Sequence, residues 1–249
     1  MGIQIRDLHK SCGDKAVLKG FSVEAREGET LVILGGSGSG KSVTLKHVVG
    51  LLTPDRGDVV VDGDVVSELT LDQLFKLRRR VGYVFQFAAL FDSLSVADNV
   101  GMGLRRHADM GPGEIRERVA DCLEMVDLVG FEERFPAELS GGQKKRAGIA
   151  RAIATRPQYL LYDEPTTGLD PVTRAMIDQL ILRMSEELGV TGIVITHDID
   201  SAFRVADRFA MLHEGRCRFV GTPDEIRNTD DPVVRGFIEG RPELMEKAT

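Results

Sequence analysis

The sequence has little aromatic and cysteine content. It contains no tryptophan, three tyrosines, 11 phenylalanines and no low-complexity tract in 249 residues, which is ordinary for a globular protein with a substantial core. Its three cysteines, Cys12, Cys122 and Cys217, are scattered, and their spacing fits neither a disulfide framework nor a metal site. We therefore expect reduced thiols and a cytosolic protein.

Long apolar runs and an excess of positive charge are also lacking. No uninterrupted apolar stretch is long enough to cross a bilayer, and the polar start lacks the apolar stretch of a signal peptide. A role in a membrane process would therefore require another chain to supply the membrane part. The formal net charge is −7, and general nucleic-acid binding needs a basic face, so we expect no nucleic-acid partner.

Short apolar runs alternate with segments of helical periodicity, which is the pattern of an α/β fold. Five runs are typical of buried strands: Thr30–Leu34, Val59–Val61, Val81–Phe85, Tyr159–Tyr162 and Ile193–Thr196. Apolar residues recur at helical spacing from Ile115 to Val126 and from Ile177 to Leu188. Asp170 is placed to cap the second of these helices, with Pro171 in its first turn.

The strand signal disappears from Phe87 to Leu139, which predicts a helical lobe inserted into the α/β core. A hairpin is predicted near the end, with its turn at Glu214-Gly215 between the strands Phe209–Leu212 and Arg216–Val220. A capping box over residues 222–225 then predicts the start of a short helix. The charged end of the chain predicts a loose segment. We expect a core formed by residues 1–86 and 155–227, a helical lobe over 87–154 and a C-terminal segment over 228–249.

The sharpest motif is Gly35-Gly-Ser-Gly-Ser-Gly-Lys-Ser42, which fits G-x-x-x-x-G-K-S between the strand Thr30–Leu34 and a helical run. Its glycines let successive N–H groups converge on an anion at a helix N-terminus. We expect Lys41 to reach the β- and γ-phosphates of ATP and Ser42 to ligate Mg²⁺. A flexible glycine–serine loop is the alternative, but the lysine, the serine and the strand–loop–helix context favour a nucleotide.

A metal-holding acid is expected on a neighbouring strand. The run Tyr159–Tyr162 ends in Asp163, which would hold Mg²⁺, and Glu164 follows at the strand edge where open α/β sheets bind ligands. A second carboxylate beside the metal ligand suits a general base that polarises the attacking water. A surface carboxylate with a structural partner is the alternative for Glu164, and the phosphate loop upstream favours the base.

The second glycine motif is Leu139-Ser-Gly-Gly-Gln143, whose glycines would open a helix from Gln143 through Ala154. Such a helix N-terminus is another anion-binding device. Two devices in one chain favour a symmetric homodimer in which each phosphate loop faces the partner's second motif. A glycine-rich helix start without a ligand is the alternative.

These motifs resemble those of ABC transporter ATPases over almost the whole chain. The resemblance implies a P-loop NTPase core with an antiparallel β subdomain and an inserted α-helical lobe. It also implies that Gln86 is the Q-loop glutamine, that Gly168-Leu-Asp170 is the D-loop, and that His197 is the switch histidine at the γ-phosphate. An isolated histidine after a strand is more often structural, but the order of the five motifs favours the switch.

The expected site residues fall into three groups. Those expected to bind nucleotide are Cys12, Gly35, Gly36, Ser37, Gly38, Ser39, Gly40, Lys41, Ser42, Val43, Ser140, Gly141, Gly142, Gln143 and Asp170. Those expected to ligate Mg²⁺ are Ser42, Gln86 and Asp163, and those expected to act in catalysis are Lys41, Gln86, Glu164 and His197. Cys12 departs from the family, which usually has an adenine-stacking aromatic there, because a thiol offers no comparable π-surface.

The segment Phe85–Val100 and the end of the chain are similar to those of Mla-type and Mce-associated phospholipid transporter ATPases. This similarity implies phospholipid cargo, a membrane permease, an Mce-domain lipid-binding protein and sometimes a small regulatory subunit, with the ATPase peripheral on the cytoplasmic face of the inner membrane. Phe87, Leu90, Phe91 and Leu94 would offer an apolar surface to a permease helix, or would pack inside the lobe.

Other functions stay open at the level of sequence. An importer ATPase for amino acids or metal ions would share every catalytic motif, and a cofactor-assembly ATPase would use the same chemistry with soluble partners. DNA-repair and translation members fit less well, because the chain has no long coiled-coil insert, no second cassette and no basic balance. A purely regulatory nucleotide sensor is disfavoured by the intact Asp163-Glu164 pair.

Overall fold

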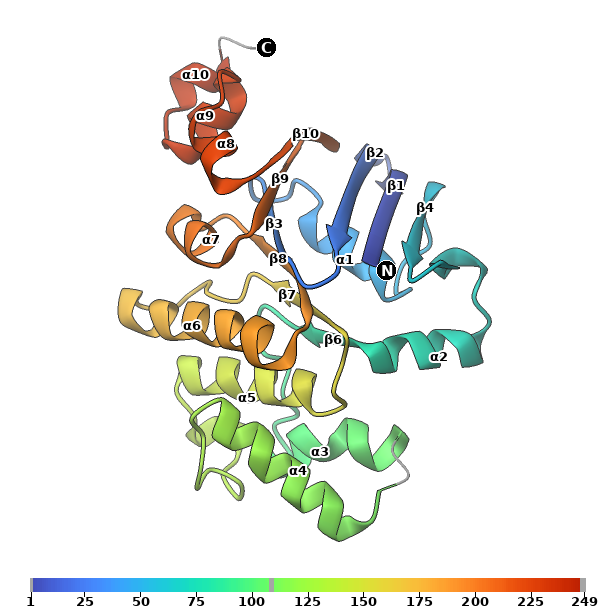
Figure 1. Cartoon of the computed structure of the whole chain (residues 1–249), viewed down its shortest axis with the longest axis vertical. Coiled ribbons are helices and arrows are strands. Elements are labelled where there is room, and N and C mark those ends of the chain that lie inside the picture. The colour runs from blue at the N-terminus through green and yellow to red at the C-terminus, as the bar shows by residue number, and fades with distance from the viewer. Residues whose placement is uncertain (1, 108–109, 247–249) are drawn as a thin grey trace. The chain divides into compact units, whose positions relative to one another are not determined.

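The computed structural model describes residues 2–107 and 110–246 (Figure 1). The chain forms two compact units. The first contains Met1–Leu74 and Thr191–Thr249, and the second contains Phe75–Val190. Each unit holds some of the expected site residues. None of the helices in the described ranges is long and apolar enough to cross a membrane.

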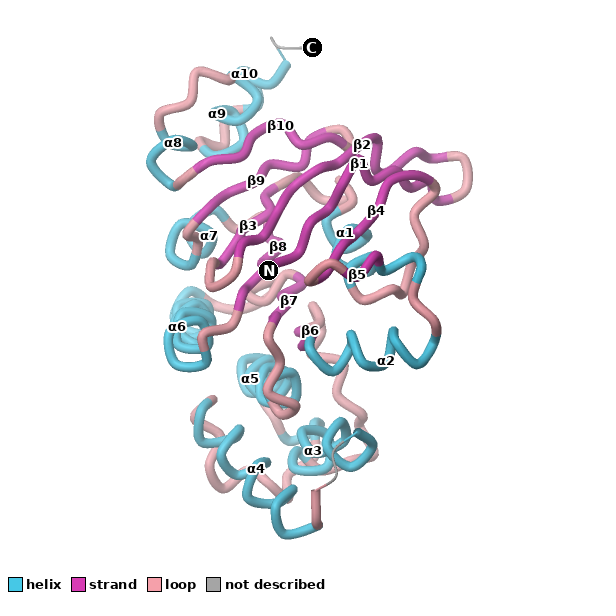
Figure 2. The backbone as a smooth tube through the Cα atoms, turned by 45° about the vertical axis from the view of Figure 1, so that its right-hand side comes forward, coloured by secondary structure: helices cyan, strands magenta, loops and turns pink. Residues whose placement is uncertain are grey.

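The first unit contains an antiparallel sheet in the strand order β2-β1-β4-β5 (Figure 2). Its strands are β1 (Gly2–Cys12), β2 (Lys15–Arg26), β4 (Arg56–Val61) and β5 (Asp64–Val65). The predicted run Val59–Val61 lies in β4, whereas β1 and β2 were not expected as individual strands. They escape a search for apolar runs because buried residues such as Ile3 and Ile5 alternate with polar ones.

The first unit also contains strands in the order β10-β9-β3-β8. They are β3 (Thr30–Leu34), β8 (Thr191–Thr196), β9 (Arg208–His213) and β10 (Arg216–Gly221). β3 lies parallel to both β8 and β9, and every residue of β3 and β8 is buried. The predicted hairpin is confirmed: Glu214 and Gly215 turn with φ of 49° and 80°, the left-handed backbone that two-residue hairpin turns use.

Helices complete the first unit: α1 (Lys41–Val48), α7 (Ile199–Val205), α8 (Pro223–Arg227), α9 (Pro232–Ile238) and α10 (Pro242–Glu246). The capping box is confirmed, because Thr222 and Glu225 bond reciprocally at the start of α8. The prediction of a loose segment after residue 228 is wrong. Asp231 caps α9, and α9 buries Val233 and Val234, so the charged composition conceals an apolar helix face.

The second unit contains the parallel pair β6 (Val81–Val84) and β7 (Tyr159–Asp163) and the helices α3 (Val96–His107), α4 (Pro112–Met125), α5 (Gly141–Ile153) and α6 (Pro171–Leu188). Short 3₁₀ turns η1 (Val66–Glu68) and η2 (Pro136–Glu138) and the helix α2 (Leu71–Arg80) complete the chain. Asp170 caps α6 as predicted. α5 begins at Gly141 and not at Gln143, because Ser140 is its N-cap.

Candidate nucleotide-binding and hydrolysis site

The phosphate loop of the first unit joins β3 to α1. Gly38 and Gly40 have φ of 72° and 107°, a left-handed backbone that favours glycine. A Cβ at Gly35 would lie 2.6 Å from the carbonyl oxygen of Leu212, and one at Gly40 would lie 2.8 Å from Cγ1 of Val17. The loop therefore packs tightly against its own unit, while nothing lies within 4 Å of a Cβ at Gly36 or Gly38.

Two side chains of this loop are suited to an anion. Lys41 is buried, and its Nζ donates to the carbonyl oxygens of Gly35 at 2.7 Å and Gly36 at 3.1 Å, which holds the ammonium at the loop. Ser39 Oγ is buried without a hydrogen-bond partner in the described structure. An orphaned buried hydroxyl is costly unless a ligand satisfies it. Glycine backbone, ammonium and hydroxyl together fit the phosphates of a nucleotide.

The remaining expected residues of the loop lie at its edge. Ser37 is exposed, and Ser42 and Val43 are half-buried in the first turn of α1. The carbonyl of Val43 is 2.8 Å from Nδ1 of His47, a side chain whose pKa is lowered mainly by burial.

His197 lies beside the start of the phosphate loop. β3 and β8 pair in parallel with Leu34 opposite Thr196, so Gly35 and His197 are the next residues on adjacent strands. The histidine is exposed. This register places its side chain at the carboxyl edge of the sheet, where open α/β sheets bind ligands.

Cys12 lies at the end of the β1–β2 hairpin, paired with Lys15, and it is exposed. The same hairpin carries Val17, the residue that approaches Gly40. Cys12 is therefore on the element that borders the phosphate loop, and it presents a small thiol there.

In the second unit, β7 ends in two buried carboxylates, Asp163 and Glu164, with 7% and 8% of their surfaces exposed. Tyr83 of β6 donates its hydroxyl to Asp163 Oδ2 at 3.0 Å. Burial, followed by the charge of Asp163, raises the pKa of Tyr83 and keeps it a donor. Tyr83 was not among the expected site residues. The sequence signal that could have identified Tyr83 is its position on the strand that precedes Gln86.

Glu164 is held in an unusual backbone conformation, with φ of 49°. Its Oε2 accepts a hydrogen bond from Thr167 Oγ1 at 3.1 Å, and its carbonyl accepts one from Nζ of Lys145 at 3.1 Å. Lys145 also donates to the carbonyl of Gln86 at 2.5 Å. Burial lowers the pKa of Lys145 to about 8, against the opposing effect of Glu164 and Asp163. Lys145 thus joins two expected catalytic residues, and its own sequence pattern gave no sign of this.

The turn after Gln86 is fixed by a second cation of α5. Ala88 and Ala89 both have positive φ, and Arg151 donates to their carbonyls at 2.7 Å and 2.5 Å. Beyond this turn, Phe87 and Phe91 are 83% and 53% exposed. The expectation of an apolar surface is confirmed for these two phenylalanines, whereas Leu90 and Leu94 are half-buried.

The second glycine motif starts α5. Ser140 and Gln143 form a capping box, with N–H to side-chain bonds of 2.8 Å and 3.3 Å. A Cβ at Gly142 would lie 2.4 Å from Cγ2 of Thr173, and Thr173 donates its hydroxyl to Asp170 Oδ2 at 2.5 Å. The structure therefore brings Gly142 and Asp170 together through Thr173. Ser140 and Gly141 are exposed.

Magnesium would have to be held by mixed ligands. The described residues contain no group of three or more histidine, cysteine or carboxylate side chains that could hold a metal ion. The first unit offers the hydroxyl of Ser42 as an oxygen ligand, and the second offers the carboxylate of Asp163 and the amide of Gln86. These are groups that Mg²⁺ accepts when phosphates and water supply its other ligands.

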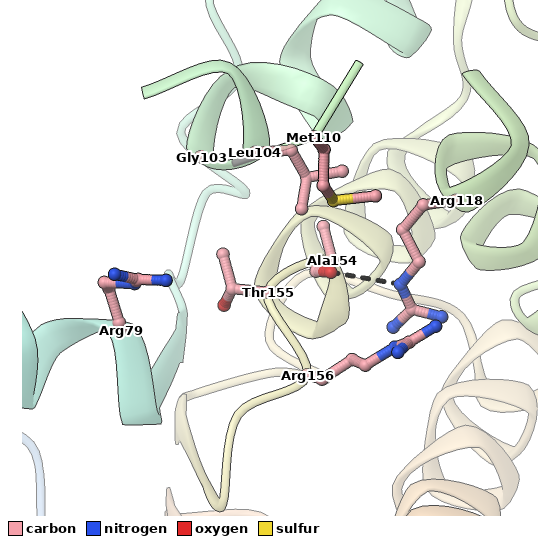
Figure 3. Close-up of a pocket in the computed structure, with 8 residues that line it drawn as sticks. All are labelled: Arg79, Gly103, Leu104, Met110, Arg118, Ala154, Thr155 and Arg156. Atoms are coloured by element: carbon pink, nitrogen blue, oxygen red, sulfur yellow. Dashed lines mark hydrogen bonds between the residues drawn. The ribbon is translucent and has the colours of Figure 1, made fainter. Parts of the chain in front are cut away.

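A basic pocket lies in the second unit, and neither Asp163 nor Glu164 is among its lining residues (Figure 3). Its lining residues are Arg79, Gly103, Leu104, Met110, Arg118, Ala154, Thr155 and Arg156. Arg118 donates to the carbonyls of Ala154 and Ile153, which fixes it at the end of α5. Figure 3 shows the guanidinium groups of Arg118 and Arg156 on the same side of the pocket.

Residues 18–167 match the sequence pattern of the family described as ABC transporter. The chain belongs to the ABC transporter family. A protein of Mycobacterium leprae described as "Probable ribonucleotide transport ATP-binding protein mkl" is 39% identical over 241 residues, covering 97% of this chain and 70% of that protein. The Arabidopsis thaliana protein TRIGALACTOSYLDIACYLGLYCEROL 3, chloroplastic, is 41% identical over 254 residues, covering 96% of this chain and 73% of that protein.

Solved structures share the fold. A dimeric, post-hydrolysis structure of the ATP-binding cassette MJ0796 bound to ADP and Pi is 36% identical, with a TM-score of 0.81 and coverage of 88% of this chain and 98% of that one. The structure of cbiO1 from Clostridium perfringens, part of the ABC transporter complex cbiONQ, gives a TM-score of 0.83 at 33% identity, with 98% of each chain covered. This ABC ATPase therefore has the expected α/β fold with parallel and antiparallel sheets, binds ATP and hydrolyses it.

Proposed function

We propose that this ABC transporter ATPase powers phospholipid transport between membranes. The observation that carries the proposal is its similarity, over 96% of its length, to the Arabidopsis relative. The name of the Arabidopsis relative contains a glycolipid, trigalactosyldiacylglycerol. The glycine loop offers an ammonium and a hydroxyl, which suit phosphates, so we assign the cargo to a partner chain.

In hydrolysis, we assign the phosphates to Lys41 and the N–H groups of the glycine loop, with Ser39 Oγ as a further donor. Mg²⁺ would be held by Ser42, Asp163 and Gln86, and it would neutralise charge that develops on the phosphates. Glu164 is the general base: it orients water and takes its proton as the oxygen attacks the γ-phosphorus. The bond from that phosphorus to the β–γ bridging oxygen breaks, and ADP leaves. His197 would contact the γ-phosphate. The buried position of Glu164 and the hydrogen bond that its carboxylate accepts from Thr167 suit a carboxylate held in place for this step.

Two copies would act together. Ser140 and Gly141 are exposed at a helix N-terminus, where N–H groups and the helix dipole favour an anion. We propose that Ser140, Gly142 and Gln143 of one copy contact the ATP held by the other, with Asp170 at the interface. The dimeric form of the MJ0796 cassette is consistent with this arrangement.

The proposed docking partner is a membrane permease. We propose that an acidic cytoplasmic segment of this permease binds the basic surface of the second unit that the following pockets form. Three pockets share Arg79 and Thr155, and their cationic lining residues are Lys76, Arg78, Arg79, Arg80, Arg106, Arg118, Arg151 and Arg156. Among the described residues that line them, none is aspartate or glutamate. So much positive charge on a chain of net charge −7 favours a negatively charged partner. Docking there would hold the ATPase on the cytoplasmic face of the membrane.

The docking proposal is tested by charge reversal. Arg79→Glu should abolish recovery of the permease from detergent extracts and leave hydrolysis by the isolated chain unchanged. Arg116→Glu is the matched control, because Arg116 is an exposed arginine of α4 in the same unit but outside these pockets. Recovery of the permease by the Arg79 variant at the level of the control would contradict the assigned surface.

The cargo is tested by purifying the tagged chain in detergent from its native cells and identifying the proteins and lipids that accompany it. A multi-span permease with an Mce-domain protein and bound phospholipid is the expected result. A small regulatory subunit would be recognised in the same preparation by its constant ratio to the ATPase. Soluble partners alone would refute lipid transport.

Amino-acid or ion import is the second candidate. The methionine import protein MetN of Caulobacter vibrioides is 43% identical over 226 residues, covering 90% of this chain and 68% of that protein. A permease recovered with a solute-binding protein and no phospholipid would favour this candidate.

A further inference from the structure

Lys145 is a buried lysine that the proposed hydrolysis step does not use. It lies in the first turns of α5, with 6% of its surface exposed. Its ammonium donates to the carbonyls of Gln86 and Glu164, which belong to two turns far apart in the sequence. An ammonium has three donors and no acceptor, so it is suited to hold two carbonyl oxygens together.

Both turns need support from outside. Glu164 has φ of 49°, and Ala88 and Ala89, just after Gln86, have φ of 58° and 49°. Non-glycine residues keep such a backbone only where surrounding contacts impose it. α5 supplies those contacts at both places, since Lys145 holds Gln86 and Glu164 and Arg151 holds the two alanines.

We propose that Lys145 is a positioning residue that couples the Q-loop to the general base. Its two hydrogen bonds tie the backbone of Gln86 to the backbone of Glu164, so the base keeps its active position only while the Q-loop is docked on α5. The proposal rests on the assignment of Glu164 as the base. The first residues of α5 belong to the second glycine motif. Through Lys145 this helix is therefore linked directly to the turn at Glu164 of the same chain.

Steady-state hydrolysis by the full chain tests this role. Lys145→Met, which keeps the length and removes the donors, should lower kcat by about tenfold and change KM for ATP by less than about twofold, because Lys41 and the glycine loop are untouched. Lys145→Arg should restore most of kcat. Lys144→Met is the matched control: it makes the same change one residue earlier, at a half-buried position, and should hydrolyse ATP like the wild type.

Hydrogen exchange separates coupling from a merely structural role. The N–H of Thr167 bonds to the carbonyl of Glu164, and the N–H of Ala88 bonds to that of Phe85. In Lys145→Met the amides of both turns should exchange faster together, and Lys145→Arg should protect them again. Faster exchange at only one turn would overturn the proposal, as would kcat of Lys145→Met within about twofold of the wild type.

Two further measurements keep the outcome decisive. Melting temperature and ATP binding establish that each variant is folded. If Lys145→Met fails to fold, Lys145→Gln replaces it. Glutamine keeps one donor group, so the kcat of this variant should lie between that of the wild type and the about tenfold lower value expected for Lys145→Met. Glu164→Gln is measured alongside. Normal hydrolysis by that variant would refute the base assignment alone, and the exchange data would still decide whether Lys145 couples the two turns.

Discussion

At the scale of single residues, the two halves of the site are built differently. Lys41 and Ser39 depend on a glycine backbone that brings an ammonium and a buried hydroxyl to one loop. Asp163 and Glu164 depend on side-chain partners, namely the hydroxyls of Tyr83 and Thr167. The sequence motif is sufficient to predict which residues form the loop, whereas the partners of the two carboxylates become visible only in the folded chain.

The exposed thiol of Cys12 leads to a prediction about ATP affinity. Cys12→Tyr should lower KM for ATP, because a ring at the end of the β1–β2 hairpin offers a stacking surface for adenine that a thiol lacks. Cys12→Ser, which adds no π-surface, is the control and should leave KM unchanged. Titration of initial rates with ATP measures both, and identical curves for wild type and the tyrosine variant would rule out stacking at this position.

The pKa of Lys145 leads to a prediction about stability. It is about 8 in the folded protein against an ordinary value of 10.5. Between these values the unfolded chain binds a proton that the folded chain has lost, so the free energy of unfolding rises with pH across that window. The stability of the wild type relative to Lys145→Met should therefore increase from about pH 8 to about pH 10.5. Chemical denaturation at several pH values measures this difference, and a constant difference would contradict the lowered pKa.

At the scale of elements, the start of α5 depends on one close contact. A Cβ at Gly142 would meet Cγ2 of Thr173 at 2.4 Å, whereas one at Gly141 would lie 3.7 Å from Leu169. Thr173 cannot easily move, because it is β-branched and its hydroxyl is bonded to Asp170.

Gly142→Ala should therefore destabilise the protein by about 1–3 kcal/mol, the usual cost of forcing extra volume into a packed site. Gly141→Ala should be neutral or stabilising, since alanine is a better helix former than glycine. Urea denaturation of the two variants compares their free energies of unfolding. Equal values would mean that Thr173 yields and that the contact is not restrictive.

Elements could be predicted from sequence where one pattern dominated. β3, the β9–β10 hairpin and the caps of α6 and α8 follow from apolar runs, turn residues and capping side chains, all of which are local signals. β1 and β2 did not stand out because their apolar residues alternate with polar ones. α9 was misjudged because its charged neighbours outweigh Val233 and Val234 in composition. Burial of a short apolar face is decided by tertiary packing, which composition does not record.

At the scale of the whole molecule, charge is unevenly distributed. The chain is acidic overall, but arginines and a lysine line three adjoining pockets of the second unit. Exposed phenylalanines lie just beyond the Q-loop of the same unit, and the N-terminus of α5 exposes Ser140 and Gly141. These surfaces suit the two kinds of partner that we propose, a permease segment and a second copy of the chain.

The central claim is that Glu164 is the base of an ATPase that closes as a dimer. The most direct measurement compares wild type with Glu164→Gln for ATP hydrolysis and, by light scattering, for molecular mass in the presence of MgATP. We predict that the variant binds ATP, persists as a dimer and loses turnover by at least about 100-fold, because a neutral amide cannot accept the proton of water. Near-normal hydrolysis by the variant, or a mass that stays monomeric with ATP, would contradict the account.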